Sequence, residues 1–130
     1  MSRLLTVSEL NWRSGDTNIL QNINFAVNSG EIIGIIGPNG AGKTSILRCI
    51  QQHISDYQGN ISFDNQNIKT YSRQHIAKHI AVVSQVNDPV FNLSVHDVVR
   101  MGLVPHKSIF ALDTQDDKNH IKQALEQTGL

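Results

Sequence analysis

Eight residues in the first third of the chain combine glycine, lysine and threonine at a spacing that suits phosphate binding. They read GPNGAGKT, in which Gly37 and Gly42 are separated by four residues and Lys43 and Thr44 follow at once. Glycines let the backbone curl until successive N–H groups surround one anion, where a larger side chain would block the phosphates. Lys43 adds a positive charge, and Thr44 adds a hydroxyl for magnesium. The pattern predicts a loop that binds nucleotide phosphates.

The segments on either side of this loop are those that such a loop requires. Residues 31–37, EIIGIIG, form an apolar run in which polar residues do not alternate with apolar ones. Such a run predicts a strand of a parallel sheet whose two faces are both buried. From Lys43 onward the period becomes helical, with Ile46, Leu47 and Ile50 on one stripe that ends near His53. The alternative is a chance glycine turn, which would arise in on the order of one chain in a couple of hundred. The flanking strand and helix make that alternative weaker still.

The remaining elements follow from alternation, helical period and capping signals. Residues 4–12 and 19–27 alternate apolar with polar side chains around the loop RSGDTN, which predicts a hairpin. Further predicted elements are a strand and turn at 59–68, a short polar helix at 72–79, a second buried strand at 80–85, a helix opened by a capping box at 94–97, and a helix at 113–129 closed by Gly129.

Composition limits the class of protein. The chain has 130 residues, the size of one domain or a piece of one, and its 11 basic residues balance 11 acidic ones. The net charge therefore gives no overall electrostatic attraction to nucleic acid, and any anion-binding site must come from a local group of residues. Cys49 is the only cysteine, which excludes an intrachain disulfide framework. Without a signal-like start or an apolar run of roughly 20 residues, we expect a soluble, cytosolic protein.

The whole chain resembles the ATP-binding cassette (ABC) ATPases, whose Walker A loop is similar to GPNGAGKT. The resemblance implies an α/β fold of the P-loop type, with an antiparallel β subdomain and part of a parallel core sheet covered by helices. It implies ATP and Mg²⁺ as cofactors, with Lys43 acting in catalysis and Thr44 as a metal ligand. The implied cofactor-binding residues of the loop are Gly37, Pro38, Asn39, Gly40, Ala41, Gly42, Lys43, Thr44 and Ser45.

Two residues outside the loop match further sites of that family. Trp12 occupies the place of an aromatic residue that stacks on adenine, since a π-face binds any base. The alternative is that Trp12 is a core or rim aromatic that closes the hairpin. Gln85, at the end of IAVVSQ, matches the Q-loop glutamine, which implies a catalytic and metal-binding role. A plain surface glutamine is the alternative for Gln85.

The stretch NLSVHDVVRMGLVPHKSIF, residues 92–110, resembles importers of ferric siderophores, haem and cobalamin. The matching residues are Arg100, Gly102, Pro105 and His106, whereas Leu103 and Val104 stand where that subfamily more often has arginine and an aromatic residue. The resemblance implies an ATPase subunit that powers uptake of an iron complex or cobalamin. Its implied partners are integral-membrane permease subunits, met through a groove at residues 86–93, and a second ATPase subunit in a homodimer. It implies a peripheral location on the cytoplasmic face of the inner membrane.

The family's signature sequence, Walker B carboxylates and switch histidine have no counterpart in these residues. We therefore expect residues 1–130 to be the amino-terminal part of one nucleotide-binding domain, which binds Mg-ATP weakly without hydrolysing it. Partner strands for residues 32–36 would also be missing. We therefore expect the isolated chain to dimerise, swap elements or aggregate through that segment, or to hold the glycine-rich loop away from its nucleotide-binding shape.

Other interpretations stay open beside this one. A nucleotide-binding regulatory or interaction module without a transport role is the main alternative, and a P-loop kinase or GTPase is weakened by the early hairpin and the strand before Gln85. His75 and His79 have metal-ligand spacing without a third ligand nearby, so a solvated polar face is favoured. Cys49 is expected to be a small core residue. Asn65 stands at a turn where the family usually has glycine, which asparagine tolerates.

Overall fold

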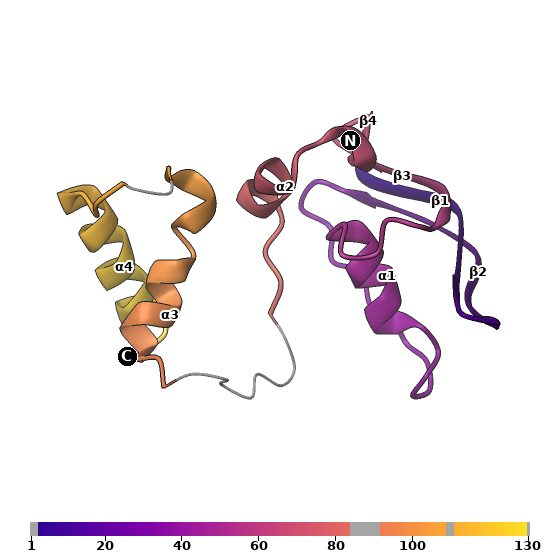
Figure 1. The fold of residues 1–130 in the computed structure, drawn as a ribbon, viewed down its shortest axis with the longest axis horizontal. Helices are drawn as coiled ribbons and strands as arrows, with labels where there is room; N and C mark the ends of the chain where they lie inside the picture. Colours follow the sequence, from indigo (N-terminus) through magenta and orange to yellow (C-terminus); the bar gives the residue numbers. More distant parts are fainter. Residues whose placement is uncertain (1–2, 84–91, 109–110, 130) are drawn as a thin grey trace. The chain divides into compact units, whose positions relative to one another are not determined.

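The computed structural model describes residues 3–83, 92–108 and 111–129 of the chain (Figure 1). The chain divides into two compact units, Met1–Ile76 and Ala77–Leu130, called here the N-terminal unit and the C-terminal unit.

The N-terminal unit is built on an antiparallel sheet of four strands in the order β2-β1-β3-β4. Strands β1 (Arg3–Ser14) and β2 (Thr17–Asn28) form the predicted hairpin, closed by a turn at Gly15 and Asp16. Strand β3 (Gln58–Phe63) pairs with the other edge of β1, and β4 (Gln66–Asn67) pairs with β3. The turn between β3 and β4 holds Asn65 at φ 62°, the left-handed conformation that asparagine tolerates.

The core of this unit lies between the sheet and helix α1 (Lys43–Ile50). After β4 come η1 (Ile68–Thr70) and α2 (Arg73–His79), and the boundary between the two units falls within α2, after Ile76. Ile46 and Ile50 on α1 are buried, as the helical period predicted, and Cys49 is buried with them. Leu47, expected on the same stripe, is 44% exposed, so this part of the prediction is wrong. Burial raises the pKa of the Cys49 thiol to about 11, which fits the expected core role. The sheet and its connections contribute the other buried side chains, Val7, Leu10, Leu20, Tyr57, Ile61, Phe63, Ile68 and Ile76.

The apolar run at residues 31–37 differs from its prediction. It forms no strand in the structure, and Ile32 and Ile36 are 96% and 97% exposed. A parallel strand needs neighbours to pair its backbone, and the strands within the described residues all belong to the antiparallel sheet. The described part of the second predicted strand, residues 80–83, is also unpaired, and residues 84 and 85 lie outside the described residues.

The C-terminal unit contains α3 (Val95–Met101), η2 (Val104–His106) and α4 (Gln115–Gln127). The predicted capping box at Ser94 is present: the Ser94 hydroxyl accepts from the Asp97 N–H, and the Asp97 carboxylate accepts from the Ser94 N–H. Helix α4 begins with a similar capping box at Thr114 and is followed by Gly129 at φ 77°. Among the residues that the structure describes, no helix has both the length and the apolar character to cross a membrane.

Candidate phosphate-binding site

The glycine-rich loop ends in a tight contact with strand β2. Gly40 and Gly42 have φ values of 83° and 86°, which favour glycine over any residue with a side chain. A Cβ atom at Gly42 would lie 2.7 Å from Leu20 Cδ2 and 3.0 Å from the Ile19 carbonyl oxygen. Gly42 is therefore required both by its conformation and by its packing, and this contact fixes where α1 begins relative to the hairpin.

The start of α1 presents backbone donors without helical acceptors. The first helical hydrogen bond here runs from the Ile46 N–H to the Gly42 oxygen, at 3.0 Å. The N–H groups of Lys43, Thr44 and Ser45 precede that bond, as at any helix amino terminus. The first turn carries no acidic side chain. These donors and the positive end of the helix dipole favour an anion at this position.

The side chain of Lys43 is folded back onto the loop. Its Nζ atom donates to the carbonyl oxygens of Gly37 and Pro38, both at 2.7 Å. The Ala41 N–H donates to the Pro38 oxygen at 3.2 Å, so one of the expected inward donors is used within the loop. The loop thus holds an ammonium group beside its free N–H groups. The glycine backbone, the cation and the exposed Thr44 together fit a nucleotide phosphate with its magnesium ion.

Trp12 lies on the face of the hairpin that also carries the contact between Leu20 and Gly42. Its partner in the β1–β2 register is Leu20, and directly opposite residues point to the same face of a sheet. Leu20 is the residue that packs against Gly42. Through Leu20, the structure brings Trp12 and the end of the glycine-rich loop to neighbouring positions, although they are 30 residues apart in sequence.

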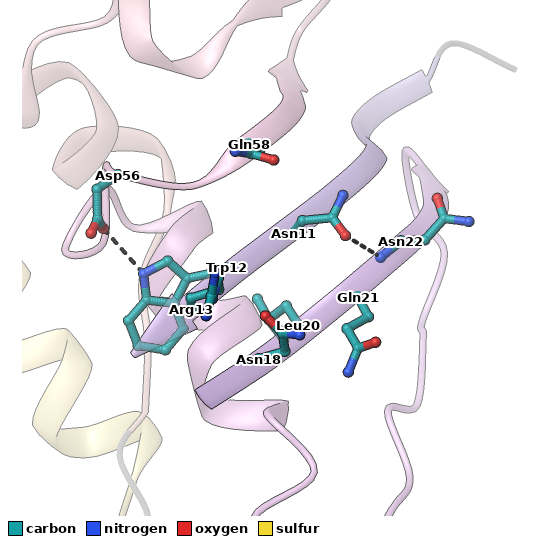
Figure 2. A pocket seen from close by; sticks show the side chains of 9 residues that line it. All are labelled: Asn11, Trp12, Arg13, Asn18, Leu20, Gln21, Asn22, Asp56 and Gln58. Atoms are coloured by element: carbon teal, nitrogen blue, oxygen red, sulfur yellow. Dashed lines mark hydrogen bonds between the residues drawn. The ribbon is translucent and has the colours of Figure 1, made fainter. Parts of the chain in front are cut away.

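The Trp12 ring borders a pocket of about 510 Å³ (Figure 2). The indole Nε1–H donates to Oδ1 of Asp56 at 3.1 Å, a bond that Figure 2 shows at the ring edge. The pocket is lined from β1, β2, the segment before β3 and the first residue of β3, by Asn11, Trp12, Arg13, Asn18, Leu20, Gln21, Asn22, Asp56 and Gln58.

The structure adds two residues that the sequence did not single out. Leu20 lies opposite Trp12 in the hairpin and beside Gly42 at the end of the loop, and Asp56 accepts a hydrogen bond from the ring edge. Neither has a motif around it, and only the fold brings Asp56 to Trp12. Gln85 and most of the groove expected at residues 86–93 lie outside the described residues, and Asn92 and Leu93 are exposed.

The other residues singled out from the sequence are the histidine pair on α2 and the residues that match the importer subfamily. The His75 ring is stacked on Tyr71, with ring centroids 4.3 Å apart. Across the described residues, no group of three or more His, Cys, Asp and Glu side chains could hold a metal ion. In the C-terminal unit, Arg100 on α3 pairs with Asp113, Gly102 caps the end of α3, and Pro105 and His106 lie in η2.

A family profile matches most of the chain. The family described as ABC transporter matches residues 20–130, which include the whole glycine-rich loop and α1 but begin after Trp12.

Curated proteins match nearly the whole chain. The iron(3+)-hydroxamate import ATP-binding protein FhuC of Bacillus subtilis (strain 168) is 33% identical over 126 residues, which cover 97% of this chain and 47% of that protein. The hemin import ATP-binding protein HmuV of Pseudomonas entomophila (strain L48) is 32% identical over 122 residues, covering 94% of this chain and 46% of that protein. The chain therefore spans about half the length of these relatives.

A solved structure shows the same fold. The structure of cbiO1 from Clostridium perfringens, part of the ABC transporter complex cbiONQ, superposes with a TM-score of 0.79 at 29% identity. The match covers 100% of this chain and 52% of that one. The predicted fold class, an ABC-type α/β fold represented in part, is confirmed.

Proposed function

The chain belongs to the ABC transporter family, and from this we propose that residues 37–45 bind the phosphates of ATP while Trp12 stacks on its adenine. The observation that carries this proposal is the packing of Gly42 against Leu20, the cross-strand partner of Trp12. A base on the Trp12 ring and a triphosphate on the loop would then lie on one side of the hairpin.

Each group at the loop has a separate task in this proposal. The N–H groups of Lys43, Thr44 and Ser45 hold phosphate oxygens, and the Lys43 ammonium leaves the loop carbonyls to contact the β- and γ-phosphates. The Thr44 hydroxyl is the proposed ligand of Mg²⁺, which neutralises charge on those phosphates when it is bound. Gln85 is the proposed second contact to the metal and the attacking water.

We assign the larger role from the relatives. Proteins named for import of an iron(3+)-hydroxamate and of hemin match nearly the whole chain. We propose that this chain is the amino-terminal part of the ATP-binding subunit of an importer for an iron complex, either a siderophore or haem, or for cobalamin. Its proposed partners are permease subunits at the cytoplasmic face of the membrane and a second ATPase subunit.

The chain of 130 residues should bind nucleotide without turning it over. It holds the loop, whereas the signature sequence and the Walker B carboxylates of the family are not among its residues. Binding and hydrolysis are therefore separable in this chain, and binding is the property to measure first.

Titration of the chain with Mg-ATP, followed by the emission of Trp12, tests the proposal. Trp12 is the only tryptophan, so its emission should change on binding. Lys43→Ala should abolish that change, because charge-assisted hydrogen bonds to phosphate are lost. Lys78→Ala, at an exposed lysine on α2, is the matched control and should leave binding intact. An emission change of equal size and affinity in Lys43→Ala would overturn the proposal.

A further inference from the structure

The bond between Trp12 and Asp56 joins two segments that are far apart in the sequence. Asp56 lies between α1 and β3, 44 residues after Trp12, and its Oδ1 atom accepts from the indole Nε1–H at 3.1 Å. The indole N–H is the only hydrogen-bonding group of a tryptophan side chain, and it can only donate. This one contact therefore uses all of the polar capacity of Trp12.

The position of the contact matters for what the ring can do. Asp56 meets the edge of the indole, and in Figure 2 it approaches from the loop before β3 and does not cover a face of the ring. Trp12 is half-buried, so packing leaves part of the ring exposed beside the pocket. An edge contact holds the orientation of the plane, while the faces keep their capacity to stack.

We propose that Asp56 is a positioning residue for base binding: it fixes the plane of the Trp12 ring before the adenine arrives. This inference rests on the proposed function and adds to it a residue that does not touch the phosphates. A ring that is already oriented loses less rotational freedom when a base stacks on it, so the bond raises the affinity for the base alone. It leaves the affinity of the glycine-rich loop for phosphate unchanged.

A purely structural role for the same bond predicts a different result. The bond would then only fasten the segment before β3 to the hairpin, and its loss would lower stability without a preference for one part of the ligand. The two roles separate when the base and the triphosphate are tested apart. Mg-tripolyphosphate supplies the phosphates without a base.

The experiment measures Mg-ATP and Mg-tripolyphosphate binding by calorimetry to the wild-type chain and to four variants. Asp56→Ala removes the acceptor, and Asp56→Asn keeps an oxygen acceptor without the charge. Trp12→Phe keeps a stacking face without the N–H donor, and the double variant combines Trp12→Phe with Asp56→Ala. Circular dichroism confirms that each variant is folded. The anisotropy of Trp12 emission without ligand reports the mobility of the ring.

The proposal predicts that Asp56→Ala weakens Mg-ATP about fivefold, the size of one lost hydrogen bond, and leaves Mg-tripolyphosphate unchanged. Asp56→Asn should restore most of the affinity. Within the Trp12→Phe background, Asp56→Ala should have no further effect, because Asp56 acts through the indole N–H. The anisotropy of Trp12 should fall in Asp56→Ala.

Three results would overturn the proposal. One is an equal loss of affinity for both ligands in Asp56→Ala, and another is the same loss of ATP affinity in the Trp12→Phe background. The third is an unchanged anisotropy of Trp12 in Asp56→Ala. If the wild-type chain binds neither ligand, the proposed function fails instead, and the anisotropy still decides whether Asp56 fixes the ring.

Discussion

The two units of the chain hold their elements together by different means. The N-terminal unit is closed by apolar side chains, and Leu10, Ile61 and Ile68 are fully buried in it. Among the described residues of the C-terminal unit, Ile121 is the one buried hydrophobic side chain. Burying an isoleucine or leucine contributes about 1.5 to 3 kcal/mol, so most of the stability of the chain is expected in the first unit.

Polar contacts centred on Lys107 connect the elements of the C-terminal unit. The Lys107 Nζ atom lies 2.6 Å from Asp113 and 2.7 Å from Asp117, and it donates to the Leu112 oxygen at 3.1 Å. Arg100 pairs with the same Asp113. Meanwhile α3 has no buried residue. The unit with the candidate phosphate site therefore has an apolar core that can hold a site rigid, whereas the elements of the other unit are connected mainly by charged side chains.

Truncation of a core side chain in the N-terminal unit should lower the stability of the chain more than any other change considered. Ile61 is 0% exposed on β3, so Ile61→Ala should lower the free energy of unfolding by about 2 to 5 kcal/mol, through lost burial and the remaining cavity. The matched change on the other unit is Val98→Ala, at a side chain 55% exposed on α3, which should cost less than about 0.5 kcal/mol. Urea denaturation followed by circular dichroism measures both. Equal costs would show that the two units do not differ in this way.

Substitution of Gly42 should have the next largest effect. Gly42→Ala places a Cβ atom against Leu20 and keeps a left-handed backbone, so it should destabilise by about 1 to 3 kcal/mol and weaken Mg-ATP binding. Gly15→Ala is the control, because Gly15 has φ 58° but nothing within 4 Å of an added Cβ. It isolates the backbone strain from the clash. If Gly15→Ala costs as much as Gly42→Ala, the contact with Leu20 has no energetic weight.

Self-association of the chain should come from the exposed isoleucines of the N-terminal unit. Ile32 and Ile36 are almost completely exposed, and burial of one such side chain in a contact between copies is worth about 1.5 to 3 kcal/mol. Light scattering over a concentration series should show association of the wild-type chain, reduced in Ile36→Lys. Val83→Lys, at an equally exposed residue of the C-terminal unit, is the control and should change association less. A monomer at every concentration would contradict this prediction.

Lowering the pH should reduce the stability of the C-terminal unit, and we expect this effect to be smaller than those above. The hydrogen bond from Lys107 lowers the pKa of Asp117, and the one from Arg100 lowers the pKa of Asp113. An unfolded aspartate has a pKa near 3.9, so these carboxylates stabilise the folded unit above about pH 4 and lose that effect as the pH falls through their folded values.

Hydrogen exchange of α4 amides measures this loss between about pH 5 and pH 2.5. Asp113→Asn should flatten the pH dependence of their protection, while Asp116→Asn, at an exposed neighbour outside the Lys107 contacts, should keep it. A pH dependence that is the same in Asp113→Asn would show that this ion pair does not stabilise the unit.

The sequence was enough to predict those elements whose formation depends on residues close together in the chain. The hairpin, α1 and the capping box at Ser94 all follow from spacing over a few residues, and the structure confirms them. The left-handed turn at Asn65 follows from the properties of one side chain. Such features need no knowledge of distant parts of the chain.

Prediction from the sequence failed where an element or a contact depends on residues far away in the chain. The run at residues 31–37 has the composition of a buried strand, but its burial requires neighbouring strands that the described residues do not provide. The contact between Trp12 and Asp56 spans 44 residues and has no local signal. The glycine-rich loop was identifiable because its chemistry is written in consecutive residues.

Amide hydrogen exchange with and without saturating Mg-ATP tests the central claim most directly. The claim is that the N-terminal unit binds the nucleotide through residues 37–45 and Trp12. It predicts slower exchange over residues 40–46 and around Trp12, no change over residues 92–129, and no protection in Lys43→Ala. Protection confined to residues 92–129, or equal protection in wild type and Lys43→Ala, would contradict the claim.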